Sequence, residues 1–407
     1  MLTYYYWPVP AGGAENQCRR LAGVLTERGH QCLILTCRCS SADIRQDEEN
    51  GVAIVRIFSL ELFLEFLQSL RNKKKALQEE KRGSRSSSAT DEQTVFQQKI
   101  SKNINSCIRF CNIIVFSLAA LFFLFRRHRL FDIIHVHTAD WIAGVAAFAG
   151  KLFKLPVICK GADMPVFPPL QAVPLAACCD GWRRKPHFIA LTSAMKDDLM
   201  RNAVPESRIT IIPNGVPVPA QTAAVEKNSH FLYIGNFSQT AAHKAFDVLL
   251  EAWAMFHHQR PVPRLLLLGG GNAEPWQTLA RQLGCAESVD FLGYQTCLPP
   301  FFEQSCCLLL PSRKEGIANA LLEAQSWGIP AIVSDIPGNR AVVEHQKNGL
   351  IVPVGDSKVL AEAMLHLHDS PELRKRYGSA ARKRMEEIFA LDTVADQTVA
   401  LYQQLAA

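Results

Sequence analysis

Apolar residues follow two patterns along this chain: short continuous runs, and longer stretches in which they recur every three or four positions. The short runs predict strands at 33–37, 52–58, 133–136, 157–159, 188–192, 231–234, 264–268, 289–292, 306–310 and 331–333. The longer stretches predict helices at 14–28, 141–153, 194–202, 246–257, 276–283, 319–327 and 357–368. Strands that are apolar throughout and alternate with helices are typical of parallel sheets covered on both faces. We therefore predict an α/β fold with two doubly wound, Rossmann-like domains facing a cleft.

The boundary between these domains is predicted at residues 211–219, where proline and glycine cluster. The charge balance also changes there. Residues 1–215 contain 28 Lys and Arg against 19 Asp and Glu, a net charge of +9, and the remainder has a net charge of −3. We expect domains at 1–215 and 216–388, followed by a C-terminal helix within 389–407 that packs back on the first domain.

Two segments of the first half depart from the alternating pattern. Residues 71–94 are charged and rich in serine, which predicts a flexible, solvated loop. Residues 108–129 are apolar and end in Arg126, Arg127 and Arg129. The apolar part, 110–125, would rise only about 24 Å as a helix, against a bilayer core of about 30 Å. A spanning helix, a buried domain helix and a helix lying in the membrane interface all remain open, the last two being favoured.

The composition excludes several classes of protein and suggests a compartment. With 407 residues, 48% of them hydrophobic and 20% charged, the chain can bury a sizeable core and is not a disordered protein. The 13 cysteines are scattered without CxxC spacing, which indicates buried thiols in a reducing compartment. No basic segment followed by an apolar one opens the chain, so we expect a cytoplasmic protein without a signal peptide. The basic first half fits an anionic membrane surface, whereas the acidic second half argues against a nucleic-acid partner.

Gly12 and Gly13 lie between a short first strand, expected within residues 1–6, and the first predicted helix. Glycines at this position let the backbone approach a ligand, and the helix amino terminus attracts phosphate. A tight turn between strand and helix would use glycine as well, so both interpretations remain. The spacing is not GxGxxG, which disfavours a nicotinamide dinucleotide site.

His135 and His137 end an apolar strand, and their spacing places both imidazoles on one face. Without a clear third ligand they make a poor metal site. A polar role at the carboxyl edge of the sheet and a purely structural role remain as alternatives.

Glu315 and Glu323 are the most informative pair of side chains. Glu315 falls at a turn from strand to helix and Glu323 lies within the following apolar helix. They are separated by about 12 Å along a helix, which is too far for the carboxylate pair of a retaining hydrolase at about 5 Å. The spacing suits two carboxylates that bind separate hydroxyls of an elongated ligand, although an N-capping acid beside a structural Glu is the alternative.

The two glutamates, with seven residues between them in a loop-then-helix setting, resemble the motif of the retaining family 4 glycosyltransferases, which have the GT-B fold. Other stretches are similar to that family along nearly the whole chain: 8–15, 28–30, 131–137, Ser193 with 212–216, 233–235, 269–271, 291–293 and 337–338. Two positions depart from it. Asn236 stands where family members often have arginine, and Lys160-Gly161 stands where they often have His-Gly; Lys160 could compensate for the missing arginine.

The resemblance implies roles for individual residues. It implies Glu315, Lys244 and His137 as catalytic residues, with Glu315 holding hydroxyls of the donor sugar and Lys244 neutralising the donor diphosphate. The implied donor-binding residues are Gly12, Gly13, Asn236, Gly270, Leu292, Gly316, Ile317, Asn319 and Glu323. Within this set, Gly13 offers backbone to the diphosphate, Glu323 holds the ribose, and Gly270 and Leu292 border the base. Neither a metal nor another cofactor is expected.

The function implied is transfer of a sugar from a nucleoside diphosphate, with UDP as the expected nucleotide. Retention of configuration and a glycan or lipid-linked acceptor of the cell envelope are also implied. The basic first half and residues 110–129 suggest a peripheral enzyme at the inner face of the cell membrane. One competing interpretation is a catalytically impaired GT-B scaffold that binds nucleotide-sugar or protein partners, which Asn236 favours. Another is a GT-B epimerase or phosphorylase.

Overall fold

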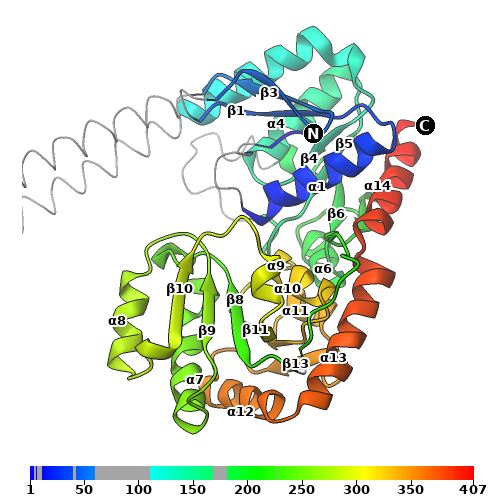
Figure 1. Cartoon of the computed structure of the whole chain (residues 1–407). Helices are drawn as coiled ribbons and strands as arrows, with labels where there is room; N and C mark the ends of the chain where they lie inside the picture. The colour runs from blue at the N-terminus through cyan, green and yellow to red at the C-terminus, as the bar shows by residue number, and fades with distance from the viewer. Residues whose placement is uncertain (4–5, 7–11, 40–42, 60–110, 168–180, 226) are drawn as a thin grey trace, which may run out of the picture.

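The computed structural model describes residues 1–3, 6, 12–39, 43–59, 111–167, 181–225 and 227–407. The predicted loop at 71–94 and the start of the apolar stretch at 108–110 lie outside the described residues. The chain forms two α/β domains, which lie one above the other in Figure 1. This arrangement of two parallel-sheet domains confirms the predicted fold class.

The first domain contains two groups of strands. One has the order β1-β3-β2, with β1 (Leu33–Cys37), β2 (Gln46–Glu49) and β3 (Val52–Ile57). The other has the order β4-β5-β6-β7, with β4 (Ile134–Val136), β5 (Val157–Lys160), β6 (His187–Ala190) and β7 (Ile209–Ile211). Leu2 joins the groups, because it bridges Leu35 of β1 and Val136 of β4 in parallel. All described pairings are parallel except β2 with β3.

Three helices with complete bounds belong to this domain: α1 (Gly13–Glu27), α4 (Trp141–Phe153) and α6 (Ser193–Arg201). Capping residues explain where two of them begin. The side chain of Asp140 accepts a hydrogen bond from the Ile142 amide at 3.0 Å, and that of Thr192 accepts one from the Met195 amide at 3.1 Å. These helices begin at the carboxyl edge of the sheet, where a ligand site is expected.

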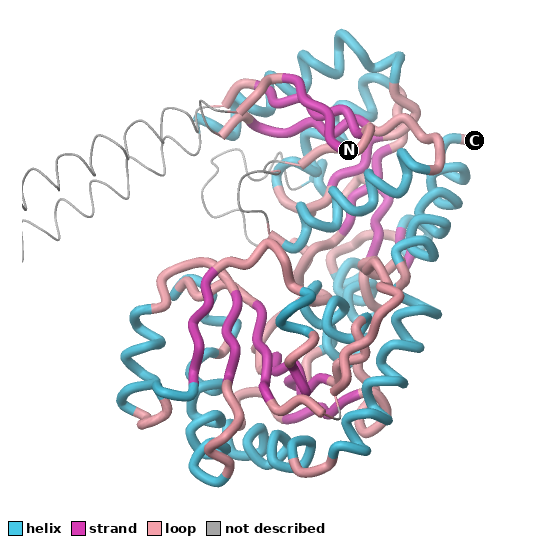
Figure 2. Tube along the Cα trace, viewed as in Figure 1, coloured by secondary structure: helices cyan, strands magenta, loops and turns pink. Residues whose placement is uncertain are grey.

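The second domain has a single parallel sheet of order β10-β9-β8-β11-β12-β13. Its strands are β8 (His230–Ile234), β9 (Leu265–Leu268), β10 (Val289–Gly293), β11 (Ser305–Leu310), β12 (Ala331–Ser334) and β13 (Gly349–Val352). Its helices are α7 (Phe246–Gln259), α8 (Glu274–Gln282), α9 (Pro299–Phe302), α10 (Asn319–Ser326), α11 (Pro337–Val342), α12 (Ser357–His368) and α13 (Pro371–Arg384). Every residue of β9, β11 and β12 is buried, as expected for strands covered on both faces (Figure 2).

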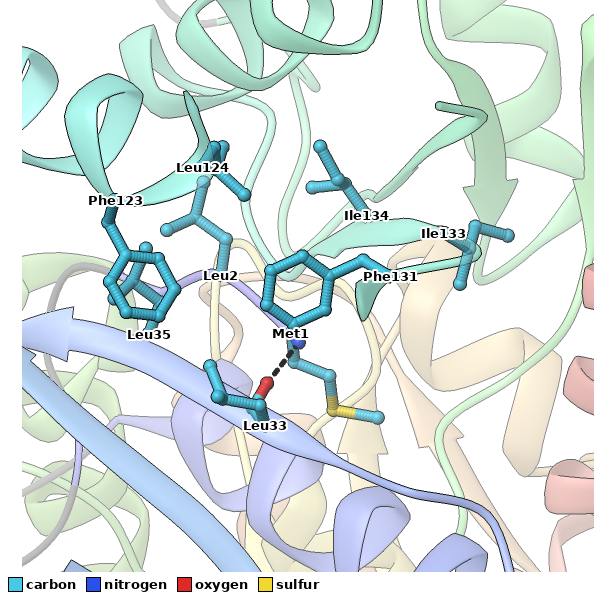
Figure 3. Close-up of a pocket in the computed structure, with 9 residues that line it drawn as sticks. All are labelled: Met1, Leu2, Leu33, Leu35, Phe123, Leu124, Phe131, Ile133 and Ile134. Atoms are coloured by element: carbon cyan, nitrogen blue, oxygen red, sulfur yellow. Dashed lines mark hydrogen bonds between the residues drawn. The ribbon is translucent and has the colours of Figure 1, made fainter. Parts of the chain in front are cut away.

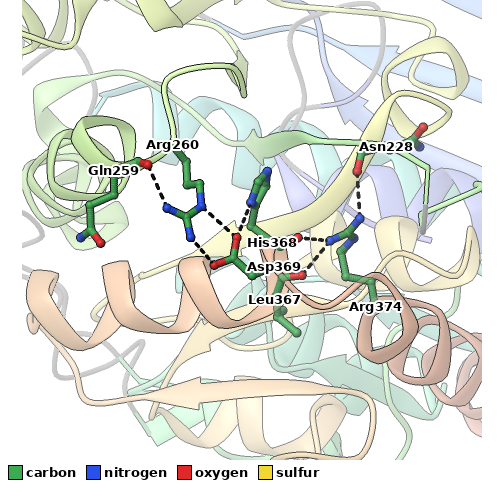
Figure 4. Close-up of polar contacts among 7 residues, drawn as sticks. All are labelled: Asn228, Gln259, Arg260, Leu367, His368, Asp369 and Arg374. Carbon is green, nitrogen blue, oxygen red and sulfur yellow. Dashed lines mark hydrogen bonds and ion pairs between the residues drawn. The ribbon is translucent and has the colours of Figure 1, made fainter.

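A cluster of polar contacts fastens the turn between α12 and α13 (Figure 4). The guanidinium of Arg260 donates two hydrogen bonds to the Asp369 carboxylate, at 2.9 and 2.7 Å. Arg374 is 4% exposed and donates to the backbone carbonyls of Val225, Leu367, His368 and Asn228. The hydrogen bonds to Val225 and Leu367 are buried, so Arg374 is the structural centre of this corner.

The last helix, α14 (Leu391–Ala406), returns the chain to the first domain, and Figure 1 shows it beside α1. Arg28, the C-cap residue of α1, pairs with Asp392 at 2.7 Å and with Asp396 at 2.5 Å. The hydroxyl of Tyr402 lies 2.5 Å from Nδ1 of His135. Residues 391–406 therefore contribute to the interior of the first domain although they follow the second in sequence.

The apolar stretch after residue 110 forms a helix over 111–127 with two different faces. Phe116, Ala120 and Leu124 are buried against the domain. The opposite face exposes Ile114, Leu118, Phe122 and Phe125. Of the helices within the described ranges, none combines the length and the apolar character needed to cross a membrane.

A small apolar cavity of about 30 Å³ lies between this helix and the sheet (Figure 3). It is lined by Met1, Leu2, Leu33, Leu35, Phe123, Leu124, Phe131, Ile133 and Ile134. Leu33 and Ile134 begin their strands, so the cavity lies at the amino-terminal edge of the sheet. Ligands of open α/β sheets bind at the opposite edge, and we therefore look for the site there.

Candidate functional site

Four of the predicted site residues lie where strands of the second sheet end. Asn236 follows β8, Gly270 follows β9, Leu292 is the penultimate residue of β10, and Glu315 follows β11. Because these strands are parallel, their carboxyl ends lie at one edge of the sheet. The fold thus brings residues from four separate segments to the edge that faces the first domain (Figure 1).

Glu315 and Lys244 form an ion pair at the centre of this edge. The Lys244 Nζ lies 2.5 Å from Oε1 of Glu315, and the Ser312 hydroxyl donates to the same oxygen at 2.9 Å. The two side chains are only 19% and 12% exposed. An ammonium and a carboxylate held together in a partly buried position can bind, respectively, a phosphate and a sugar hydroxyl.

Gly316 places the next part of this loop against the first domain. A Cβ atom at Gly316 would lie 2.3 Å from the backbone oxygen of Ala162, which follows β5. Gly338 is packed equally closely, since its Cβ would lie 1.8 Å from the Gly316 oxygen. Lys314 also pairs with Asp163 across the domains at 3.4 Å. The loop that contains Glu315 is therefore part of the contact between the two domains.

Asn319, the first residue of α10, connects that helix to α1. Its side-chain Nδ2 donates to the Gly13 carbonyl at 2.9 Å, and its Oδ1 accepts from Nε2 of Gln17 at 2.9 Å. Gln17 also bonds both backbone groups of Gly215, at 2.9 and 3.1 Å. Asn214 donates to the carbonyl of Ile317 at 3.2 Å. The amino ends of α1 and α10, from different domains, thus lie side by side, and Gly12 begins α1 as its N-cap residue.

Glu323 lies one helical turn beyond Asn319 and forms an ion pair with Arg20 of α1. The two side chains are 17% and 24% exposed, so the pair is partly shielded from water. The role of Glu323 in holding a ribose remains a prediction. The ion pair with Arg20 brings Glu323 into contact with the first domain.

The loops expected to border a base also lie together. The Phe237 amide donates to the Gly270 carbonyl at 2.7 Å, and the Gly269 amide donates to the Gly293 carbonyl at 2.8 Å. Gly270 faces open space, since a Cβ there would meet no atom within 4 Å. Asn236 is exposed and its Oδ1 accepts from the Ser238 amide at 2.7 Å. Together with the 36% exposed Leu292, they form a rim beside the Glu315 loop.

His137 is not joined to these residues by a hydrogen bond. It is 2% exposed, its ring stacks on His135 at 4.4 Å, and neither ring nitrogen has a partner within the described part of the chain. Burial lowers the pKa of His135 and of His137 well below the usual value, so both rings are neutral near pH 7. The catalytic role of His137 stays a prediction.

Lys160 is buried beneath the domain linker. It is 5% exposed, and its Nζ donates to the Pro213 carbonyl at 3.4 Å. Burial lowers its pKa to about 8. Its suggested compensation for the missing arginine also stays a prediction.

Three residues of this region were not predicted as site residues: Gln17, Arg20 and Ser312. Gln17 and Arg20 lie four and seven positions after Gly13, on the same face of α1, so helical periodicity could have indicated them. Their partners could not be inferred, because those depend on how the domains pack. Within the described ranges, no group of three His, Cys, Asp or Glu side chains is arranged to hold a metal ion.

Two family models of known proteins match different parts of the chain. Residues 218–384 match the family model described as Glycosyl transferases group 1. Residues 83–218 match the model described as Glycosyltransferase Family 4. The two matches meet at residue 218, within the segment that joins the domains.

Individual relatives match part of the chain. An uncharacterized glycosyltransferase of Haemophilus influenzae is 25% identical over 212 residues, which are 52% of this chain and 59% of the relative. A D-inositol 3-phosphate glycosyltransferase of Streptomyces avermitilis is 34% identical over 172 residues, 39% of this chain and 37% of the relative. The matched part is thus about half the length of these curated relatives, or less.

A solved structure matches nearly the whole chain. The structure of HepE from Anabaena in complex with UDP-glucose is 15% identical, with a TM-score of 0.71, and covers 99% of this chain and 98% of its own. At this identity the similarity shows the fold. The chain thus has the fold of GT-B glycosyltransferases, and its two parts each match a glycosyltransferase family model.

Proposed function

We propose that the protein transfers a sugar from a nucleoside diphosphate to a glycan or a lipid-linked acceptor, with retention of configuration, in the synthesis of a cell-envelope polysaccharide. The observation that carries this proposal is the Lys244–Glu315 pair, which lies beside the amino end of α10 at the contact between the domains. In this arrangement a positive potential that attracts a diphosphate lies next to a carboxylate that can bind sugar hydroxyls.

The proposed reaction needs stabilisation of a departing diphosphate. Lys244 and the backbone N–H groups at the start of α10 would oppose its negative charge, and Glu315 would hold hydroxyls of the donor sugar. The bond from the sugar C1 to the diphosphate oxygen breaks, and a bond from C1 to the acceptor oxygen forms on the same face. The acceptor's proton passes to the leaving phosphate oxygen. Lys244 supplies the required charge, so no metal is assigned to the step.

UDP is the nucleotide we expect. The similar fold of HepE, solved with UDP-glucose, supports this choice. In the free protein Lys244 and Glu315 satisfy each other. A bound donor would replace that contact with one from Lys244 to its phosphate and one from a sugar hydroxyl to Glu315, so both side chains would keep a polar partner.

We place the enzyme at the cytoplasmic face of the cell membrane. The exposed face of the 111–127 helix supports this location, with Leu118, Phe122 and Phe125 between 61% and 64% exposed. Exposed Arg126, Arg127 and Arg129 follow, and residues 111–131 contain no Asp or Glu. An apolar face bordered by cations suits the interface of an anionic bilayer.

The C-terminal half of α4 extends this surface. His128 stacks on Phe153 at 4.9 Å, and Phe148 packs edge-on against Trp182 at 5.5 Å. Lys151 lies over the same Trp182 ring at 5.3 Å. Aromatic rings beside basic side chains are typical of surfaces that lie at lipid headgroups.

A scaffold that binds nucleotide-sugar without turnover is the second candidate, favoured by Asn236 in place of an arginine. A thermal-shift panel of UDP-, GDP- and ADP-sugars, followed by an assay for nucleoside diphosphate release, separates the candidates. We expect one nucleotide to raise the melting temperature selectively and to be released during turnover. Stabilisation without any release would support the scaffold, and neither effect would contradict both candidates.

A further inference from the structure

Arg20 lies on the face of α1 that meets the second domain. Gly13, Gln17 and Arg20 are spaced four and three residues apart, which places them on one side of the helix. Asn319 and Glu323, four residues apart on α10, face them. Arg20 is therefore the last member of a row of contacts that begins at the predicted diphosphate site.

The guanidinium of Arg20 is only partly used by this contact. Its Nη2 pairs with Oε1 of Glu323, whereas its Nη1 is buried and has no hydrogen-bond partner within the described residues. A buried guanidinium N–H without an acceptor is unfavourable. The Arg20 Nη1–H therefore lacks an acceptor in the described part of the chain, and it lies next to Glu323, the carboxylate that is predicted to hold a ribose.

A ribose would supply an acceptor for this N–H and donors for the neighbouring carboxylate. Its vicinal 2′- and 3′-hydroxyls are donors for a carboxylate, and each hydroxyl oxygen can also accept an N–H. A diol can thus donate hydrogen bonds to the Glu carboxylate and accept one from the neighbouring Arg N–H. Arg20 also holds the carboxylate in a fixed orientation, because the ion pair is partly shielded from water.

We propose that Arg20 is a positioning residue for donor binding. It orients Glu323 toward the ribose of the nucleotide and donates its unused Nη1–H to a ribose oxygen. This proposal rests on the proposed function, since it requires a nucleotide between α10 and the sheet edge. The alternative is that the ion pair merely fastens the two domains.

The test compares nucleotides that have and lack ribose hydroxyls. Dissociation constants are measured by calorimetry for UDP, GDP and ADP and for their 2′-deoxy and 3′-deoxy forms, with the full chain. The variants are Arg20→Met, Arg20→Lys and a control on the same helix, Arg19→Met, which breaks a pair with Glu49 of β2. Melting temperatures are recorded for each variant without ligand.

For the nucleotide that binds, we expect the wild-type protein to prefer the ribose form over at least one deoxy form by about tenfold. Arg20→Met should weaken binding of the ribose form by about tenfold and bring the preference close to unity. Arg20→Lys should restore part of the preference, and Arg19→Met should leave it unchanged.

Two results would overturn the assignment of Arg20. In one, Arg20→Met weakens the ribose and deoxy forms equally and so preserves the preference, as a simple domain contact would. In the other, Arg20→Met lowers the melting temperature and leaves every dissociation constant at its wild-type value. If Arg20→Met does not fold, Arg20→Lys is used instead. A wild-type preference for the ribose form in Arg20→Lys would then overturn the assignment, and a reduced preference would support it. If none of the nucleotides binds the wild-type protein, the proposed function itself fails.

Discussion

At the residue scale, burial decides which side chains are charged. His135 and His137 are 1% and 2% exposed, and burial lowers the pKa of both rings well below 6.5. Lys160 and the N-terminal amine lie near enough to oppose protonation of these rings as well. The stacked pair is therefore a neutral part of the domain interior at pH 7, although each imidazole is polar.

This burial predicts a specific loss of stability in acid. Between the lowered pKa and 6.5 the unfolded chain binds protons that the folded chain does not, so stability falls as the pH drops below 6.5. Each histidine contributes up to about 1.4 kcal/mol per pH unit. We expect the free energy of unfolding, measured with urea, to decline less between pH 7 and pH 5 in His137→Phe than in the wild-type protein. Phenylalanine keeps an aromatic ring at this position but has no nitrogen to protonate. An equal decline in both proteins would contradict the assignment.

At the element scale, most strands and helices followed from the apolar pattern, whereas the short apolar strands β7 and β13 and several polar elements were not predicted. The predicted strand 33–37 and helices 141–153 and 357–368 have the bounds of β1, α4 and α12. Strand β2, with sequence QDEE, and helix α13, with RKRYGSAARKR, have too few apolar residues to show a period. Their formation depends on neighbours, as β2 pairs with β3 and α13 is fastened through Arg374.

Replacing Arg374 tests how strongly the stability of α13 depends on this one side chain. Arg374→Met would remove four hydrogen bonds to backbone carbonyls, two of them buried, and we expect the free energy of unfolding to fall by about 3 kcal/mol. Arg376→Met, on the exposed side of the same helix, should change it by less than about 0.5 kcal/mol. Chemical denaturation measures both values. Similar losses in the two variants would show that the cluster in Figure 4 does not fasten the helix.

At the scale of the whole molecule, the sequence predicted two facing domains but not the contacts between them. Glu315 and Lys244 were predicted to act together, and they form an ion pair. The partners of Glu323 and Asn319 come from α1, some 300 positions away in sequence. No local pattern encodes such pairs, because they arise only when both sheets have formed and the domains have closed.

The division of charge between the domains predicts how the molecule meets a membrane. We expect the protein to co-sediment with vesicles that contain anionic lipids and to be released by salt. Phe122→Ser with Phe125→Ser should lower the partition coefficient by about tenfold, since two exposed rings leave the interface. Val262→Ser, an 81% exposed residue of the second domain, is the matched control. Equal binding by all three proteins would place the membrane contact elsewhere.

The central claim is that Lys244 and Glu315 bind the diphosphate and the sugar of one donor. The most direct test is the rate of nucleoside diphosphate release from the sugar nucleotide selected in the thermal-shift panel, measured for wild type, Lys244→Met and Lys347→Met. Lys347 is 74% exposed and serves as the control. We expect Lys244→Met to lower kcat by about 100-fold and Lys347→Met to leave it unchanged. A wild-type kcat in Lys244→Met would contradict the claim.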